Sequence, residues 1–297
     1  MPLQPKNFDP RQQMKSADFE LQYKRDSYLK DVELHHHDFF EIYFLLSGDV
    51  TYLIDSRIVH VMPGDLLLIS PRELHQVIIR PEMSAYERYV LWVDPQVIQR
   101  LSSEQSDLLS GLDPTRMGRG NQLRLKPEDR TRIQSLLDQL SRESGSDSYG
   151  ADLLRTSLLT QLLVTINRLC QQQGPWVDED NRTNRAVTQV MNYVNLHYNE
   201  PLSLDMLAEQ FYVSKYHLSH EFNRQVGTSV YHYIQKKRLL IARQLLAQGK
   251  KPSQVYSSCG FADYTGFYRA FKTEYGMSPR EFASAVRQKN TERTESE

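Results

Sequence analysis

The last third of the chain contains one pattern twice: two short amphipathic segments with helical spacing, separated by a tight turn. In the first copy, apolar residues recur at helical intervals from Leu204 to Phe211 and again at Leu218 and Phe222. Ser203 and Ser214 precede the two segments, where a hydroxyl can accept a hydrogen bond from the free amides of a first helical turn. The pattern therefore predicts two capped helices joined by a turn, the arrangement called helix-turn-helix.

The second copy of the pattern begins at Pro252. Gly260 is expected to end its first helix, because glycine readily adopts the left-handed conformation that follows helix ends. Asp263 can cap the second helix through its carboxylate. Phe267 and Phe271 lie one turn apart on that helix and are expected to anchor it in a core. Two copies of the whole pattern strongly favour a helical domain.

The two copies and the helix between them match the residue pattern of one known family at Leu207-Ala208, Ser214 to Phe222, Gly227-Thr228-Ser229, Arg238, Ala242, Leu245-Leu246, Gly260-Phe261, Asp263, Phe267, Phe271-Lys272 and Gly276-Met277-Ser278-Pro279. On these residues, the segment 186–284 resembles the DNA-binding domain of the AraC/XylS family of bacterial transcription regulators. The resemblance implies a sequence-specific regulator, favours activation, and implies double-stranded DNA and RNA polymerase as partners. It also implies that the protein is not an enzyme.

Charge is distributed unevenly along the chain of 297 residues, which is long enough for two domains. Residues 1–181 include 20 basic and 27 acidic residues, whereas residues 182–297 include 16 basic and 10 acidic ones. The basic surplus coincides with the two helix-turn-helix copies, as a polyanion-binding domain requires.

Composition also bears on the compartment. No apolar run approaches the roughly 20 residues that cross a bilayer, and the N-terminus lacks an apolar signal core. The two cysteines, Cys170 and Cys259, lie far apart within helical patterns and are expected to be ordinary thiols in a reducing environment. We therefore expect a soluble, cytoplasmic protein without a membrane partner.

The N-terminal part is expected to begin with a β-domain. Residues 1–18 are polar and predict a flexible arm, and residues 19–97 contain short apolar runs punctuated by turns. The runs are Glu41–Leu46, Val50–Ile54, Leu66–Ile69, Gln76–Ile79 and Tyr86–Val93, and the turns are Ser47-Gly48-Asp49, Asp55-Ser56 and Pro63-Gly64-Asp65. Their spacing is typical of an all-β barrel or sandwich.

Residues 98–173 are expected to be helical, with amphipathic stretches from about Pro127 to Glu143 and from about Ala151 to Gln172. The second stretch has more apolar surface than one neighbour needs. It can pack onto the β-domain alone, or it can also form a homodimer interface.

The remaining boundaries follow from composition. The polar residues 174–184, which contain Gly-Pro, predict a linker, and residues 185–286 the DNA-binding domain. Residues 287–297 predict a disordered polar tail. The predicted fold class is α+β with two domains: a β-domain with appended helices, then an all-α domain in which a linker helix joins two helix-turn-helix motifs.

An α-helix fits the major groove of B-DNA, so a recognition helix must expose polar and basic side chains opposite its core residues. On the recognition helix of the first copy these residues are Lys215, Tyr216, Ser219, His220, Asn223 and Arg224. On that of the second copy they are Tyr264, Thr265, Gly266, Tyr268, Arg269 and Lys272. Arg269 is the best candidate for a base contact, since its planar guanidinium can bind O6 and N7 of guanine together.

The family resemblance narrows the base contacts to Tyr216, Ser219 and His220 in the first copy and Thr265, Gly266 and Arg269 in the second. The family usually has arginine where this chain has His220. A histidine can still donate to a base or a phosphate, but less strongly at neutral pH. The first copy is therefore expected to contribute less.

The helix between the copies, from about Ser229 to Ala247, is expected to have one apolar and one basic face. Its buried residues would be Ile234, Leu239, Ala242, Leu245 and Leu246, and its displayed residues Lys236, Lys237, Arg238 and Arg243. Arg238 is at least as well suited to be a structural anchor as a phosphate contact. The resemblance implies a rigid spacer that holds both recognition helices in successive major-groove segments, about 34 Å apart.

A histidine-rich segment gives candidate ligand residues. The run His35-His36-His37-Asp38-Phe39-Phe40-Glu41, with Gly48, Pro63-Gly64-Asp65 and His75, resembles the two motifs of the cupin barrel and the sensor domain of the same regulator family. The resemblance places His35, His37, Glu41 and His75 at the positions that bind metal in metal cupins. Such ligands suit a divalent transition metal, although sensor cupins of such regulators often keep these histidines around an organic effector instead.

Strand alternation directs residues two apart into one interior, so the effector pocket of this cupin-like barrel is expected to include His35, His37, Glu41, Tyr43, His75 and Trp92. Trp92 offers an apolar face to a sugar ring, and Glu41 and the imidazoles can bind hydroxyls, although Tyr43 and Trp92 can equally be core. We expect a carbohydrate or related metabolite as the effector. The alternatives are an effector-independent regulator with a vestigial barrel and a metal-dependent cupin enzyme with a DNA-binding tail.

Overall fold

The computed structural model describes residues 12–26, 32–71, 73–79, 85–113, 120–172 and 185–294. The chain forms two units, Met1–Asp180 and Asn181–Glu297. In the described residues, the first unit contains sheets and helices and the second only helices, which confirms the predicted α+β fold class. The boundary between the units falls in the predicted linker, 174–184, which lies outside the described residues, as does most of the predicted arm, 1–18.

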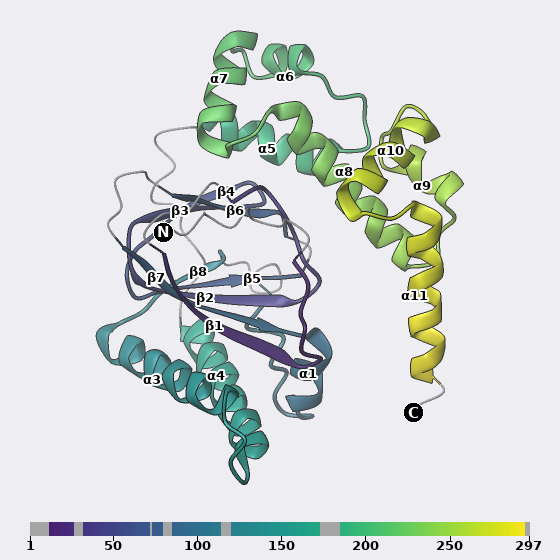
Figure 1. Ribbon diagram of the computed structural model, residues 1–297. Coiled ribbons are helices and arrows are strands. Elements are labelled where there is room, and N and C mark those ends of the chain that lie inside the picture. The colour runs from purple at the N-terminus through teal and green to yellow at the C-terminus, as the bar shows by residue number, and fades with distance from the viewer. Residues whose placement is uncertain are drawn as a thin grey trace, which may run out of the picture. The chain divides into compact units, whose positions relative to one another are not determined.

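Two antiparallel sheets form the first unit (Figure 1). The larger sheet has the strand order β1 (Phe19–Asp26), β7 (Tyr86–Val93), β2 (Phe40–Ser47), β5 (Asp65–Ile69), β8 (Gln122–Arg124). The smaller has the order β4 (Arg57–Val61), β3 (Val50–Ile54), β6 (His75–Ile79). The five predicted apolar runs correspond to β2, β3, β5, β6 and β7. The three strands outside those runs, β1, β4 and β8, all lie at sheet edges, where partial exposure weakens the apolar signal. Strand β8 also corrects the prediction that residues 98–173 are helical, because it pairs with β5 at the edge of the larger sheet.

Alternation along the strands divides the larger sheet between two cores. Phe40, Ile42 and Phe44 of β2 belong to the core shared with the helices. Tyr43 and Leu45 belong to a second core, which the larger sheet shares with the smaller one. The interior between the two sheets is therefore made of alternate residues, as expected for a barrel or sandwich.

Three helices pack on the other face of the larger sheet: α1 (Pro95–Leu101), α3 (Pro127–Ser144) and α4 (Ala151–Gln172). The last two match the predicted helical stretches closely. Leu158, Leu162 and Ile166 of α4 are buried in the core beneath this face. Packing onto the β-domain, one of the two roles predicted for this helix, is thus observed, while Leu153 and Leu154 remain exposed.

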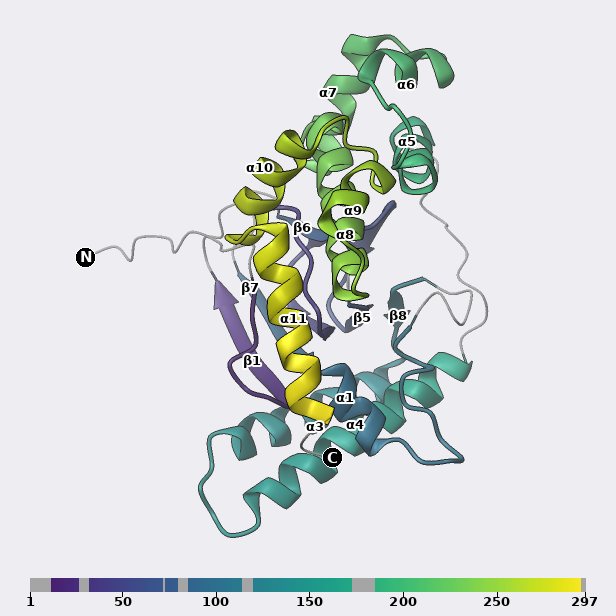
Figure 2. The ribbon, with the colours of Figure 1, turned by 90° about the vertical axis from the view of Figure 1, so that its right-hand side faces the viewer.

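The described part of the second unit contains the helices α5 (Arg185–His197), α6 (Leu204–Gln210), α7 (Lys215–Val226), α8 (Val230–Ala247), α9 (Pro252–Ser258), α10 (Tyr264–Tyr275) and α11 (Pro279–Thr294). The two helix-turn-helix pairs are α6 with α7 and α9 with α10, and α8 runs between them. Helices α9, α10 and α11 contact α8 and gather along it in Figure 2. None of the described helices is both long and apolar enough to cross a membrane.

Side-chain caps fix the starts of α6, α7 and α10, as predicted, whereas α9 begins without a side-chain cap. Ser203 caps α6, and Ser214 caps α7 by accepting a first-turn amide at 3.1 Å. Asp263 caps α10 in the same way at 2.7 Å. Each such cap stabilises a helix by about 1 kcal/mol. Both recognition helices end at glycines in the left-handed conformation, Gly227 and Gly276.

Two charged side chains of α8 have partners inside the unit. The sequence predicts a displayed Lys236, but this residue is 5% exposed, and its ammonium donates to Glu274 Oε1 of α10 at 2.7 Å. Arg238 is an anchor, since its guanidinium donates to the carbonyl oxygens of Tyr198 at 2.8 Å and Glu200 at 2.7 Å. The prediction for Lys236 is wrong because its long aliphatic stem lets the ammonium reach a carboxylate on another helix.

The predicted disordered tail at 287–297 needs correction over residues 287–294, because α11 continues to Thr294, and residues 295–297 lie outside the described residues. After Pro279 this helix contains no glycine and no further proline. Its lysine, arginine, glutamate, glutamine and alanine residues all have high helix propensity. The helix therefore extends past Ala283, its last buried residue in the described part of the chain.

Candidate DNA-binding surface and ligand site

The outward face of α7 carries the six residues predicted for the first recognition helix. All six are exposed: Lys215, Tyr216, Ser219, His220, Asn223 and Arg224. Leu218 and Phe222, on the opposite face, are buried. The helix therefore presents a polar face of the kind that enters a major groove.

The charged residues of this face are paired within the protein. Lys215 Nζ lies 2.8 Å from a carboxylate oxygen of Asp205. Arg224 Nη2 lies 2.7 Å from Glu221 Oε2, and the Arg224 guanidinium holds the pKa of Glu221 at about 2. His220 Nδ1 is 3.5 Å from the same carboxylate group. A DNA phosphate must therefore compete with these carboxylates for the basic groups of α7.

The outward face of α10 differs in this respect. Tyr264, Thr265, Arg269 and Lys272 are exposed, and Gly266 and Tyr268 are partly exposed. Phe267 and Phe271 are fully buried beneath them. Arg269 makes no ion pair within the described residues, so its guanidinium is available to a base or a phosphate.

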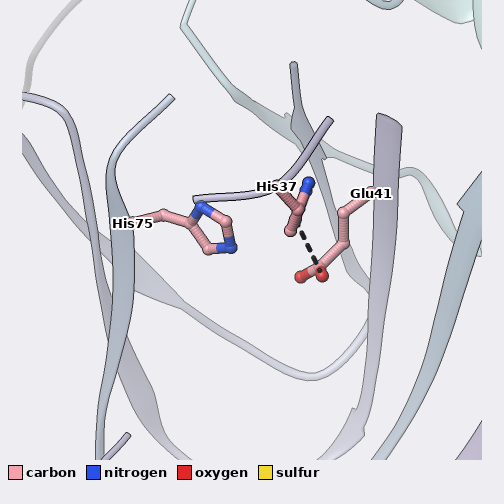
Figure 3. A group of neighbouring side chains, drawn as sticks. All are labelled: His37, Glu41 and His75. Carbon is pink, nitrogen blue, oxygen red and sulfur yellow. Dashed lines mark ion pairs between the residues drawn. The ribbon is translucent and has the colours of Figure 1, made fainter. Parts of the chain in front are cut away.

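A second group of candidate residues lies in the interior between the two sheets. His37 precedes β2, Glu41 lies within β2, and His75 begins β6. Figure 3 shows the three side chains directed toward one another. Their ligand atoms all lie within 4.8 Å of one another, and His37 Nε2 is 3.4 Å from Glu41 Oε2. A backbone bridge between His35 and His75 joins the histidine segment to β6 and brings the group together.

Backbone carbonyls fix the orientation of the imidazoles. Each Nδ1 lies against a carbonyl oxygen two residues away: His35 with Glu33 at 2.8 Å, His37 with Phe39 at 2.8 Å and His75 with Glu73 at 2.9 Å. A neutral imidazole that donates from Nδ1 carries its lone pair on Nε2. In the described part of the protein, Nε2 of His37 and Nε2 of His75 are buried without a hydrogen-bond partner.

The protonation states of the group follow from burial and mutual charge. Burial, with the neighbouring His37, lowers the pKa of His75 to about 4, and burial lowers the pKa of His35 well below its ordinary value. Burial alone would raise the pKa of Glu41, but the nearby His37, His75 and His35 outweigh it and lower that pKa. Near neutral pH, Glu41 is therefore a carboxylate, and His35 and His75 are neutral.

The structure places all six residues predicted for the effector pocket in buried positions: His35, His37, Glu41, Tyr43, His75 and Trp92. Trp92 Nε1 donates to Glu41 Oε2 at 2.9 Å, and the Tyr43 hydroxyl donates to that of Tyr86 at 2.8 Å. Of the four predicted metal ligands, His37, Glu41 and His75 form the close group. The His35 ring instead lies against the His75 ring, with centroids 4.2 Å apart.

Further polar residues of this interior were not predicted from the sequence. Arg88 is 7% exposed, lies 3.9 Å above the Tyr86 ring and pairs with Asp26 at 2.5 Å. Lys24 Nζ lies 5.8 Å from the Trp92 ring centroid. Arg88 lies four residues from Trp92 on β7, so strand alternation could have placed both on one face. The interior thus contains two cations as well as the carboxylate of Glu41.

Comparison with known proteins agrees with both parts of this description. An AraC-like ligand binding domain matches residues 17–163, and a helix-turn-helix domain matches residues 207–285. The HTH-type transcriptional activator RhaS of Salmonella arizonae is 26% identical over 251 residues, which cover 83% of this chain and 86% of RhaS. The probable transcriptional regulator LumQ of Photobacterium leiognathi is 31% identical over 133 residues, which cover 44% of this chain and 54% of LumQ.

Among solved structures, ToxT of Vibrio cholerae O395 aligns with 91% of this chain and 99% of its own, with 11% identity and a TM-score of 0.36. The family models carry the assignment. The ligand-binding model falls on the first unit and the helix-turn-helix model on the second. The family resemblance noted in the sequence is confirmed, and the chain belongs to the AraC family of DNA-binding transcription regulators.

Proposed function

We propose that this protein activates transcription in the bacterial cytoplasm when a small polar metabolite, such as a carbohydrate, binds between the two sheets of its N-terminal unit. The observation that carries this proposal is the chemistry of that interior. An interior built only for stability would be apolar, because burying a charge is costly unless it is compensated. This one holds Glu41, Arg88 and Lys24 beside aromatic rings.

These groups suit a hydroxylated ligand. Carboxylates and cations bind hydroxyl groups through charge-assisted hydrogen bonds, and aromatic rings cover the apolar faces of a sugar. We assign the pocket to His35, His37, Glu41, Tyr43, His75 and Trp92, together with Lys24, Tyr86 and Arg88. Tyr43 is fully buried and the Trp92 ring lies 4.7 Å from that of Phe39, so these two contribute to the walls of the pocket.

DNA is read by both recognition helices in this proposal. Tyr216, Ser219 and His220 of α7 and Thr265, Gly266 and Arg269 of α10 contact base edges. Lys215, Asn223, Arg224, Tyr264, Tyr268 and Lys272 contact the backbone or flank those contacts. The exposure of these residues, opposite the buried Phe222 and Phe271, supports this assignment.

The active form is proposed to be a homodimer that contacts RNA polymerase. The curated relative RhaS is a transcriptional activator, which supports activation rather than repression. Exposed Leu153 and Leu154, at the start of α4, supply apolar surface for a second copy. The effector must bind one arrangement of the protein better than another, and such coupling typically changes DNA affinity by about 5- to 150-fold.

The proposal is tested by screening sugars and related metabolites against the purified full chain by thermal shift. Each stabilising compound is then added to a gel-shift assay on the promoter of the neighbouring operon and to transcription with purified RNA polymerase. We expect at least one compound to raise the melting temperature and transcription together. The matched variant Arg88→Lys should weaken the response and leave DNA binding without the compound unchanged. A stabilising compound that changes neither DNA affinity nor transcription would contradict the proposal.

A further inference from the structure

We infer that Lys24 and Arg88 together bind an acid group of the effector, a carboxylate or a phosphate, between the two sheets of the N-terminal unit. The inference rests on the proposed function, because it names the chemical class of the metabolite that occupies that pocket. The effector is then a hydroxylated acid, such as a sugar acid or a sugar phosphate, and not a neutral sugar. Carboxylates and phosphates share the negative oxygen atoms that lysine and arginine bind.

Lys24 and Arg88 lie directly opposite each other on two neighbouring strands, β1 and β7. Directly opposite residues of an antiparallel pair project from the same face of the sheet. For this pair it is the inner face, because Val90 and Trp92, which follow Arg88 at alternate positions, belong to the core between the two sheets. Two cationic side chains therefore lie side by side in the interior.

This juxtaposition of like charges destabilises the protein when no anion lies between them. Like charges directly opposite each other across a sheet repel, and partial burial strengthens the repulsion because less water screens it. Burial lowers the pKa of Lys24, and the Arg88 guanidinium lowers it further. Charges that are held in place although they destabilise the free protein are typical of a binding site.

Donors of both side chains are left unused by the groups around them. Arg88 Nη1 pairs with Asp26 at 2.5 Å and also donates to the Tyr86 carbonyl oxygen at 3.3 Å. Arg88 Nε and Nη2 donate no hydrogen bond within the described residues. Lys24 Nζ donates none there either and lies 5.8 Å from the Trp92 ring centroid. An acid group of the effector would supply the missing acceptor oxygens.

The carboxylates near Lys24 do not account for its charge. Asp26 and Glu41 both act on Lys24, since each raises its pKa. Asp26 is already paired with Arg88, and Glu41 already accepts a hydrogen bond from the Trp92 indole at 2.9 Å. Neither carboxylate forms an ion pair with Lys24 in the part of the chain that the structure describes. Lys24 is therefore the cation whose partner comes from outside the chain.

The pair also lies where a small molecule can reach it. Strand β1 is an edge strand of the larger sheet, and its inner-face residues Glu20, Gln22, Lys24 and Asp26 are all polar and partly exposed. By contrast, the inner-face residues of β2 and β5 are buried. The acid site is thus at the rim of the interior, where the charged group of a ligand keeps part of its hydration.

The deeper part of the pocket suits the hydroxyl groups of such an acid. Trp92 connects the two parts, because the Lys24 ammonium faces its ring and its Nε1 donates to Glu41 Oε2. Beside Glu41, Nε2 of His37 and Nε2 of His75 are buried without a hydrogen-bond partner within the described residues. One small molecule can therefore place its acid group against the two cations and its hydroxyls against the carboxylate and the imidazoles.

Matched acids and neutral compounds test the inference on the purified full chain. Galacturonate is compared with galactose, and glucuronate and the phosphate ester of glucose are compared with glucose, by thermal shift and titration calorimetry. Other sugars are compared with their acids in the same way. We expect at least one acid to bind saturably and its neutral counterpart to bind at least about 30-fold more weakly, because losing one partner of a buried charged hydrogen bond has an effect of this size.

The variant Lys24→Met separates a binding role from a structural one. It removes the charge that repels Arg88, so the free protein should melt at a higher temperature than the parent. Binding of the acid should nevertheless weaken at least about 30-fold. Arg25→Met is the matched control, because Arg25 is the next residue on β1, pairs with Glu87 and has a side chain that is 69% exposed. It should bind the acid as the parent does.

The acid site and the proposed function fail in different ways. The acid site is overturned if no acid binds, if a neutral compound binds as tightly as its acid, or if Lys24→Met binds the acid as the parent does. Lys24→Gln replaces Lys24→Met if circular dichroism shows that the latter is not folded. A neutral effector that changes DNA binding would leave the proposed function standing. An acid that binds through Lys24 but changes neither DNA affinity nor transcription would support the acid site and contradict the proposed function.

Discussion

The two helix-turn-helix motifs, α6 with α7 and α9 with α10, have the same construction, but their basic side chains differ in whether they form ion pairs. In both, a first helix of 7 residues precedes a recognition helix of 12 residues with a side-chain cap and a terminal glycine. In the first motif, Lys215 and Arg224 form ion pairs with carboxylates of the same motif. In the second, Arg269 is exposed without an ion pair in the described structure.

The two helix-turn-helix motifs also differ in how their recognition helices, α7 and α10, pack against α8. The α7 side is secured by aromatic packing, with the Phe222 and Tyr233 rings 5.7 Å apart. The α10 side adds the buried ion pair between Lys236 and Glu274. The difference indicates a division of labour. In the proposed complex with DNA, the second helix-turn-helix offers Arg269, which has no ion pair among the described residues, whereas the first would have to break the ion pairs of Lys215 and Arg224 to bind phosphates.

The largest expected effect comes from breaking the ion pair on the α10 side. Lys236→Met leaves Glu274 without its partner, and removing one member of a buried pair should cost roughly 3 kcal/mol of unfolding free energy. Denaturant unfolding measures this loss. The double variant Lys236→Met with Glu274→Leu should recover most of it, because no charge is then left unpaired. A single variant as stable as the parent would show that α8 holds α10 by apolar contacts alone.

Arg269→Ala tests whether the free guanidinium reads a base. We expect a loss of about 1–3 kcal/mol in binding to the specific duplex, with little change on random duplex. Fluorescence anisotropy with both duplexes at one salt concentration measures the difference. Equal losses on the two duplexes would make Arg269 a phosphate contact. The second helix-turn-helix would then have no base contact through this guanidinium.

Lys272→Ala is the counterpart on the same helix. An exposed lysine near the DNA backbone should weaken binding to all sequences alike and reduce the slope of log affinity against log salt by about 1. The same anisotropy titrations, repeated over a range of salt concentrations, measure that slope. A sequence-dependent loss would instead place Lys272 at a base edge.

The smallest expected effect is a gain. Glu221→Gln removes the carboxylate that holds Arg224 and lies near His220, so both groups become more available to phosphates. DNA affinity should rise slightly, and its dependence on salt should steepen. Asp205→Asn offers a matched test through Lys215. Unchanged or weaker binding in both variants would show that these ion pairs do not limit the DNA affinity of the first helix-turn-helix.

Much of the fold could be predicted because its signals are local. The caps at Ser214 and Asp263 and the apolar periodicity of α7 and α10 lie within a few residues of the structure that they specify. The central strands were predicted for the same reason. The edge strands β1, β4 and β8 were not, because most of their residues are partly or fully exposed and give a weaker apolar pattern, whereas the edge strand β6 begins with three buried residues and was predicted.

Contacts that depend on distant partners were harder to predict. Nothing near Lys236 in the sequence indicates that its ammonium meets Glu274 on another helix. The approach of His75 to His37 and Glu41 was inferred from a family motif, not from local pattern. That motif also included His35, whose side chain lies beside the group rather than within it, because the extended backbone bridge sets its ring against that of His75.

The anchoring of Arg238 has a consequence for promoter architecture. The Arg238 side chain, on α8, donates hydrogen bonds to the carbonyl oxygens of Tyr198 and Glu200, which precede the first helix-turn-helix. It also packs near Gly260 in the turn of the second helix-turn-helix, where an added Cβ would lie 3.0 Å from Arg238 Nε. Arg238 therefore links α8 to the segment before the first helix-turn-helix and lies close to the turn of the second. Inserting about five base pairs, half a helical turn, between the two DNA segments would rotate one segment to the far side of the duplex. Two rigidly connected recognition helices could not then bind both segments at once.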